Sequence, residues 1–203
     1  IIAEVNRIKG IDEIKFEGNK DLIKIIGKDI DMAFIEEVKK LVLSPEAIER
    51  HKDLKMVYTP LHGTGITLVP PTLKAIGFTN IIHVPEQDVI SGDFPTVVSP
   101  NPEEPEALDL AIKKAIETGA EIVMGTDPDA DRIGTAIRDA EGNFMLLNGN
   151  QAMLIFFYYL ITRRNELNKL TGKDYIVKTI VSTELAAPIA HRYGVEMFDC
   201  YTG

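Results

Sequence analysis

Short apolar runs alternate with stretches of helical periodicity over most of the chain. Helices are predicted over residues 29–43, 66–76, 105–119, 149–167 and 183–193. Apolar runs of strand length lie between them, namely "KMVY", "NIIHV", "EIVMG", "YIVKTIV" and "VEMFD". Such short, continuously apolar strands are typical of parallel sheets covered on both faces. The pattern therefore predicts the α/β class, a three-layer α/β/α sandwich with a mostly parallel (mixed) sheet, followed by the start of a second similar domain.

Two connections add to this picture. Residues 85–105 form a long segment rich in Pro, Gly, Asp and Glu. A connection of that length inside a compact domain is usually functional or disordered. Two short strands, about 133–138 and 143–147, flank the turn "DAEGN", and a domain boundary is predicted near this turn. The chain opens on Ile1 and Ile2 rather than on methionine, which suggests a piece of a longer protein.

Composition and charge exclude several classes of protein. The formal net charge of −9 argues against a nucleic-acid partner. The most apolar stretch, "AMLIFFYYLI", is too short for a membrane span and is expected to form a mostly buried helix. The single cysteine, Cys200, excludes an internal disulfide and a multi-cysteine metal site. It is expected to be a small core residue in a protein of the reducing cytoplasm.

Three aspartates follow the apolar run "EIVMG" in the stretch "GTDPDADRIG". Ligands of α/β sheets gather beyond the carboxyl ends of strands, where Asp127, Asp129 and Asp131 are placed. Carboxylates within about 4 Å of one another repel by roughly 4 kcal/mol per pair at an effective dielectric near 20. They therefore need a cation or protons, and ligands that are all oxygen favour Mg²⁺ or Ca²⁺.

The aspartates and the nearby loops also allow other interpretations. An EF-hand fails because Arg132 and Arg138 stand where that loop needs Gly and Glu. A phosphatase of the haloacid-dehalogenase type, with an aspartate nucleophile after a buried strand, and a solvated acidic turn both stay open. The stretch "LHGTG" is not a P-loop because no Lys follows its second Gly, so His62, Gly63 and Gly65 are expected to serve packing.

Five segments in this order resemble the alpha-D-phosphohexomutases, the phosphoglucomutase/phosphomannomutase family. They are "YTPLHGTG", "GDFPTVVSPNPEEPEAL", "GTDPDADR", "LNGNQ" and the terminal "YTG". The resemblance implies a parent of four domains around one cleft. It places residues 1–29 in the tail of the first domain, 30–141 in the second domain with the metal-binding loop, and 142–203 in the opening of the third.

The resemblance also implies an activity. A phosphoserine of the first domain exchanges phosphate with glucose or mannose phosphates, so that hexose 1-phosphate and hexose 6-phosphate interconvert through a bisphosphorylated sugar. Glucose 1,6-bisphosphate activates the parent, and its partners are sugar phosphates and the remaining domains of the polypeptide. This chain lacks the Thr-Ala-Ser-His-Asn-Pro type of motif that carries the nucleophile, and Ser99 does not replace it. The piece alone is therefore expected to be inactive.

Site residues follow from the same resemblance. Asp127, Asp129 and Asp131 would hold one Mg²⁺, and Arg132 would contact the phosphate in transit. Thr202 and Gly203 fall where the family places a substrate-binding loop. A metal-binding domain without catalytic activity remains the alternative from outside the enzymes.

Overall fold

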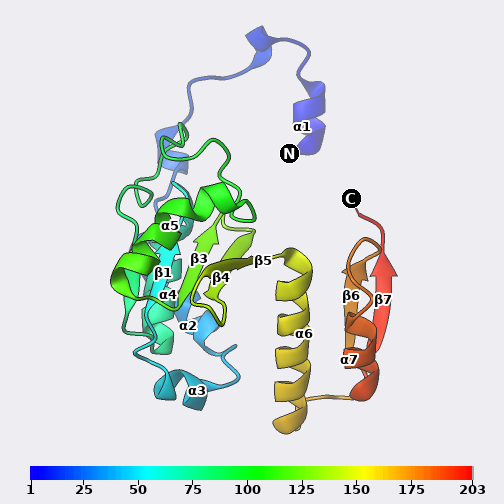
Figure 1. Ribbon diagram of the computed structural model, residues 1–203. Coiled ribbons are helices and arrows are strands. Elements are labelled where there is room, and N and C mark those ends of the chain that lie inside the picture. The colour runs from blue at the N-terminus through cyan, green and yellow to red at the C-terminus, as the bar shows by residue number, and fades with distance from the viewer. Residues whose placement is uncertain (203) are drawn as a thin grey trace. The chain divides into compact units, whose positions relative to one another are not determined.

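The computed structural model describes residues 1–202 and divides the chain into two compact units, Ile1–Phe34 and Ile35–Gly203 (Figure 1). Short helices dominate the first part of the chain: α1 (Ile2–Arg7), the 3-10 turns η1 (Ile11–Glu13) and η2 (Lys20–Leu22), α2 (Gly27–Lys39) and α3 (Pro45–Arg50). None of the residues 1–34 is buried. The first unit therefore has no core of its own.

The second unit contains a five-stranded sheet in the order β2-β1-β3-β4-β5. Its strands are β1 (Met56–Thr59), β2 (Ile81–His83), β3 (Ile122–Thr126), β4 (Ile133–Arg138) and β5 (Phe144–Leu147). β1 is parallel to both β2 and β3, whereas β4 is antiparallel to β3 and to β5. Only β4 therefore runs against the others, and the expectation of a mostly parallel, mixed sheet is confirmed.

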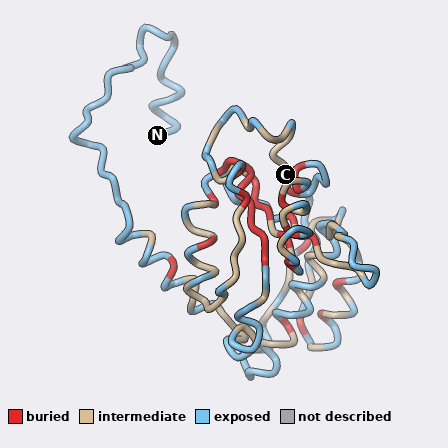
Figure 2. The backbone as a smooth tube through the Cα atoms, turned by 60° about the vertical axis from the view of Figure 1, so that its left-hand side comes forward, coloured by how far each residue is buried: buried red, intermediate tan, exposed pale blue. Residues whose placement is uncertain are grey.

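Helices cover this sheet from both sides. Successive side chains of a strand point to opposite faces, so neighbouring residues of β1 pack against different layers. Val57 and Val123 pack with Ala111 and Ala115 of α5 (Pro105–Thr118) in one buried cluster. Tyr58, the next residue along β1, faces Gly65 in the 3-10 turn η3 (Thr64–Thr67), which leads into α4 (Val69–Ile76). Figure 2 shows the buried stretches, in red, concentrated on the central strands. The α/β/α layering is confirmed.

The helix predicted over 66–76 begins later than expected. Residues Thr64–Thr67 form a 3-10 turn, and α4 starts at Val69 with prolines in its first turn. Pro70 and Pro71 lack N–H donors and fit only where a helix leaves its N–H groups unpaired. For the helix predicted over 105–119, the C-terminal end is confirmed, because Gly119 caps α5 with a φ of 68°.

The last part of the chain forms a separate two-stranded sheet. Its strands, β6 (Tyr175–Thr179) and β7 (Glu196–Cys200), are parallel, and α6 (Gly149–Glu166) and α7 (Ala186–Arg192) accompany them. Ile161, Ala190 and Val195 make a small buried cluster. β5 belongs to the first sheet, through its pairing with β4, and the domain boundary near residue 142 stays a prediction.

Two expectations about this last part are wrong. α6 is not mostly buried, since Ile161 is its one buried residue among those described, and Phe156 and Tyr158 are about half exposed. Cys200 is exposed rather than part of the core. Both segments are largely apolar in sequence, but several of their apolar side chains, including Ile155, Phe156 and Phe198, are about half exposed. None of the described helices combines the length and apolarity that crossing a membrane requires.

Candidate metal centre

The three predicted aspartates meet in the turn between β3 and β4. Asp127 directly follows β3, and one oxygen from each of Asp127, Asp129 and Asp131 lies within 4.8 Å of the others. The turn closes through two backbone bonds, from Ala130 N to the Asp127 carbonyl at 3.0 Å and from Asp127 N to the Arg132 carbonyl at 3.4 Å. Ala130 adopts a left-handed φ of 60°. Asp127 is buried, and the other two aspartates are exposed.

Arg132 holds the buried carboxylate of Asp127 with two hydrogen bonds. Its backbone N–H donates to Oδ1 at 2.9 Å, and its Nε donates to Oδ2 at 2.8 Å. The side chain of Arg132 is 52% exposed, and its Nε also lies 3.7 Å from Oδ1 of Asp131. A buried carboxylate needs such partners because leaving water is costly for an ion. The guanidinium therefore reaches from a buried anchor to the surface beside the exposed aspartates.

The charges of this turn influence one another. Burial raises the pKa of Asp127, but the backbone and side-chain hydrogen bonds from Arg132 outweigh it, and the net pKa lies below the usual value. The hydrogen bond with Asp127, and then the charges of Asp129 and Asp127, raise the pKa of Asp131. The hydrogen bond to Asp127 raises the pKa of Arg132. The crowding of like charges at Asp131 is what a bound cation would relieve.

The loop after β1 supports the aspartate turn from the side. Thr64 donates from its backbone N (2.8 Å) and its hydroxyl (3.1 Å) to the carbonyl of Pro128. A Cβ on Gly63 would lie 2.3 Å from the Cα of Pro128. Only glycine therefore allows the two backbones to approach this closely. The packing role expected for Gly63 is confirmed.

His62 is buried and ties the same loop to the long segment that precedes α5. Its Nδ1 lies 2.9 Å from the Val89 carbonyl, and its Nε2 lies 2.8 Å from the hydroxyl of Thr96. Gln87, fully buried, joins this network by accepting from the Thr59 hydroxyl at 2.7 Å and donating to Thr96 at 3.2 Å. The buried polar network thus orders a segment that has no helix or strand of its own.

One residue near the site was not predicted. Asn101 belongs to this long segment, and its Oδ1 accepts from Nη1 of Arg132 at 3.3 Å. The sequence predicted only that residues 85–105 form a long connection that is functional or disordered, although an Asn before Pro commonly shapes a turn through its side chain. The Asn-Pro pair could have predicted a turn at this position, but it does not indicate that Asn101 contacts Arg132.

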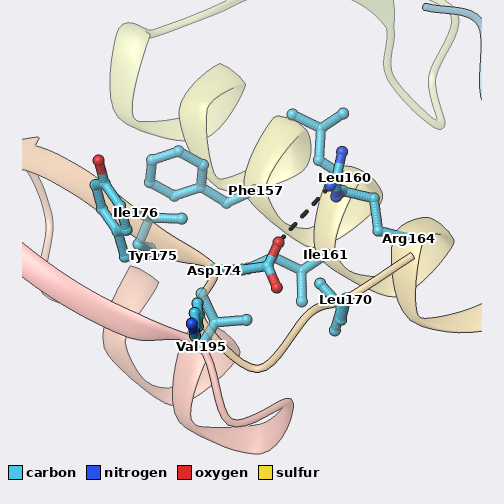
Figure 3. A pocket seen from close by; sticks show the side chains of 10 residues that line it. Phe157, Leu160, Ile161, Arg164, Leu170, Asp174, Tyr175, Ile176 and Val195 are labelled. Carbon is cyan, nitrogen blue, oxygen red and sulfur yellow. Dashed lines mark ion pairs between the residues drawn. The ribbon is translucent and has the colours of Figure 1, made fainter. Parts of the chain in front are cut away.

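Of the remaining predicted site residues, the structure describes only Thr202, and it makes no hydrogen bond to the aspartates within residues 1–202. Thr202 is exposed at the end of the described chain, and Gly203 lies outside the described residues. An apolar cavity of about 410 Å³ lies elsewhere, between α6 and β6, with the ion pair Arg164–Asp174 (3.7 Å) at its side (Figure 3). None of the three aspartates lines it.

Comparison with known proteins decides the family. The sequence profile described as phosphoglucomutase/phosphomannomutase, alpha/beta/alpha domain II, matches residues 32–142, which is more than half of the chain. The chain belongs to the phosphoglucomutase/phosphomannomutase family. The aspartate turn and the loops that hold it all fall within the matched residues.

Individual members of the family cover most of this chain. A phosphoglucomutase of Staphylococcus saprophyticus is 36% identical over 181 residues, which are 89% of this chain and 32% of that protein. A phosphomannomutase of Mycoplasmoides pirum is 32% identical over 191 residues, covering 94% of this chain and 34% of that protein. The chain therefore spans about a third of the length of these relatives.

Solved structures show the same fold. A phosphoglucomutase/phosphomannomutase family protein of Burkholderia thailandensis matches with a TM-score of 0.65 at 21% identity, over 86% of this chain and 33% of that one. The N-acetylphosphoglucosamine mutase of Aspergillus fumigatus, in complex with GlcNAc-6P and magnesium, matches with a TM-score of 0.56 at 16% identity, over 85% and 33%. At these identities the likeness concerns the fold.

Proposed function

We propose that this chain is the central part of a phosphohexomutase that interconverts hexose 1-phosphate and hexose 6-phosphate of glucose or mannose. Residues 1–29 would be the tail of its first domain, 30–141 its second domain and 142–203 the opening of its third. Membership of the family and the profile match over 32–142 support this arrangement. The observation that carries the proposal is the trio of carboxylates beside Arg132.

The residues of the turn fit a hard divalent cation. The three donors are all carboxylate oxygens and gather within 4.8 Å of one another, and such oxygens are the ligands that Mg²⁺ prefers. Each oxygen of Asp127 accepts one hydrogen bond from Arg132 and keeps a further lone pair. Bound there, Mg²⁺ would act as a Lewis acid on the phosphoryl group.

Arg132 would contact the phosphate in transit. Its guanidinium is anchored at Nε by Asp127 while about half of the side chain is exposed. A planar cation with several donors suits phosphate oxygens in two-point contact. In the proposed reaction, a sugar hydroxyl attacks the phosphorus and gives up its proton as the new phosphate ester forms, while the bond between phosphorus and the serine oxygen breaks and that oxygen takes up a proton. The second phosphate of the bisphosphorylated sugar then returns to the serine by the reverse step.

The alternative of an aspartate nucleophile agrees less well with the geometry. Asp127 is 1% exposed, and both of its carboxylate oxygens accept hydrogen bonds from Arg132. A nucleophilic carboxylate must present an oxygen to the substrate phosphorus. Asp127 is therefore better suited to hold a cation and an arginine than to attack a phosphate.

A substitution at Asp129 tests the proposed function. This side chain is exposed and makes no hydrogen bond or ion pair within residues 1–202, so Asp129→Asn removes the negative charge of a candidate ligand without disturbing the fold. In the full-length protein, with catalytic glucose 1,6-bisphosphate, we expect Mg²⁺-dependent conversion of glucose 1-phosphate to glucose 6-phosphate to fall by about 100-fold or more.

The matched control is Asp109→Asn, which changes an exposed aspartate on α5 and should leave the rate unchanged. Equal unfolding midpoints for the two variants would show that the loss is chemical. Full mutase activity in Asp129→Asn would contradict the metal assignment. Release of free phosphate by the wild type, without isomerisation of glucose or mannose phosphates, would overturn the mutase proposal in favour of a phosphatase.

A further inference from the structure

The orientation of Arg132 depends on more than its ion pair with Asp127. Asp127 holds Nε at 2.8 Å, and Asn101 accepts from Nη1 at 3.3 Å. Within residues 1–202, Nη2 makes no hydrogen bond. Because the guanidinium is planar and rigid, contacts at two of its nitrogens fix its plane. They leave both N–H groups of Nη2 and the second N–H of Nη1 available to a ligand.

Asn101 is itself fixed by its neighbours. Its Nδ2 donates to Oε1 of Glu104 at 3.0 Å, and its Oδ1 accepts from the backbone N of Glu103 at 3.2 Å. The backbone N of Glu104 donates to the Asn101 carbonyl at 3.0 Å. The donor side of the amide is therefore directed at a carboxylate. Its acceptor oxygen is shared between the backbone N of Glu103 and Nη1 of Arg132.

A pair of glycines allows the segment around Asn101 to pack closely against β3 and β4. Gly125 of β3 and Gly134 of β4 are register partners. A Cβ on Gly134 would lie 1.9 Å from the carbonyl oxygen of Pro102, and a Cβ on Gly125 would lie 2.5 Å from a methyl of Leu108. Pro102 is fully buried where it packs against these glycines. The neighbouring Asn101 is thereby placed next to Arg132, which precedes Gly134 by two residues.

We infer that Asn101 is a positioning residue, which holds the guanidinium of Arg132 in the plane that directs Nη2 to the phosphate. The inference rests on the proposed function, in which Arg132 contacts that phosphate. Asn101 need not touch the substrate, and its effect passes through Arg132. Loss of one such hydrogen bond should lower the rate of phosphate transfer by about 3- to 10-fold.

A double-mutant cycle in the full-length protein tests this coupling. Asn101→Ala should lower kcat for glucose 1-phosphate by about 3- to 10-fold in the wild-type background and cause no further loss in an Arg132→Ala background. The control is Asn80→Ala, which also removes an amide hydrogen bond, from Nδ2 to the Asp53 carbonyl (2.8 Å), at the opposite ends of the strands. It should leave kcat unchanged.

The same cycle separates positioning from general structural support. If Asn101 only stabilised the segment before α5, its replacement would lower the unfolding midpoint and reduce the rate equally in both backgrounds. Equal losses in both backgrounds, or an unchanged kcat in Asn101→Ala, would overturn the inference. These results require a wild type with mutase activity, and its absence would overturn the proposed function instead.

A measurement without catalysis tests the contact directly. In the ¹⁵N spectrum of arginine side chains, a guanidinium held at two nitrogens rotates slowly and gives separate Nη signals. Arg132, assigned by its loss in Arg132→Lys, should show separate signals in the wild type and one averaged signal in Asn101→Ala. Its Nε signal should persist because Asp127 still holds it. An averaged wild-type signal would overturn the inference whatever the activity of the protein.

Discussion

At the scale of single residues, Asp88 is a partly buried carboxylate that is incompletely paired. Its Oδ2 lies 3.0 Å from Nδ1 of His83, but its Oδ1 is buried without a partner among the described residues. Burial raises the pKa of Asp88, and Glu86 adds to the increase while His83 opposes it. Asp127, by contrast, has both oxygens satisfied by Arg132.

This contrast predicts a pH-dependent gain of stability from Asp88→Asn. Because the pKa of Asp88 is higher in the folded than in the unfolded protein, the folded protein binds this proton more tightly. The group therefore stabilises the fold at a pH below its unfolded pKa, and this contribution is lost as the pH rises through the folded pKa. The variant should therefore unfold at a higher temperature than the wild type at pH 7.5. The difference should shrink as pH falls towards 4.5.

Thermal unfolding between pH 4.5 and 7.5 checks this prediction. Asp109→Asn controls for the loss of one negative charge, because Asp109 is exposed on α5. A difference between Asp88→Asn and wild type that stays constant, or grows as the pH falls, would contradict the assignment of the penalty to the buried carboxylate.

At the scale of elements, the aspartate turn owes its position to a loop from another part of the chain. Gly63 has extended backbone angles (φ −99°, ψ −176°), so alanine is allowed there by the backbone. The obstacle is space, because its Cβ would lie 2.3 Å from Pro128. Gly63→Ala should displace the aspartate turn and weaken divalent-metal binding by about tenfold, as expected when support around metal ligands is disturbed.

Titration of Mn²⁺ into the full-length protein measures that change. Gly92→Ala is the matched control, since nothing lies within 4 Å of a Cβ at that position, and its affinity should equal that of the wild type. Unchanged metal affinity in Gly63→Ala, with an unchanged unfolding midpoint, would show that the turn does not depend on this contact.

The sequence predicted elements better than it predicted contacts between them. Periodicity and caps placed α5 and the central strands, because those signals are local. The three aspartates could be found because they are close in sequence, follow a buried strand and carry like charges. Asn101 could not be assigned to Arg132, because that contact depends on how Pro102 packs on Gly134. Long-range packing of this kind produces no sequence periodicity in either segment, so it cannot be predicted from the sequence pattern.

At the scale of the whole molecule, residue burial differs sharply between the two units. No residue between 1 and 34 is buried, and several apolar side chains there, including Ile2, Ile11 and Phe16, are more than three-quarters exposed. In the second unit, Val57 and Val123 are completely buried in the core of the five-stranded sheet. Because apolar burial is the main stabilising contribution to folding, the measured stability of this chain should come from its second unit.

Deletion of residues 1–26 tests this prediction. Because the deletion removes no buried side chain, it should change the unfolding midpoint of the 203-residue chain by less than about 2 °C. Val123→Ala, which creates a cavity in the core, serves as the comparison and should lower the thermal unfolding midpoint by about 5 °C or more. A fall on deletion as large as that caused by Val123→Ala would contradict the prediction. It would show that residues 1–26 contribute to stability as a core substitution does.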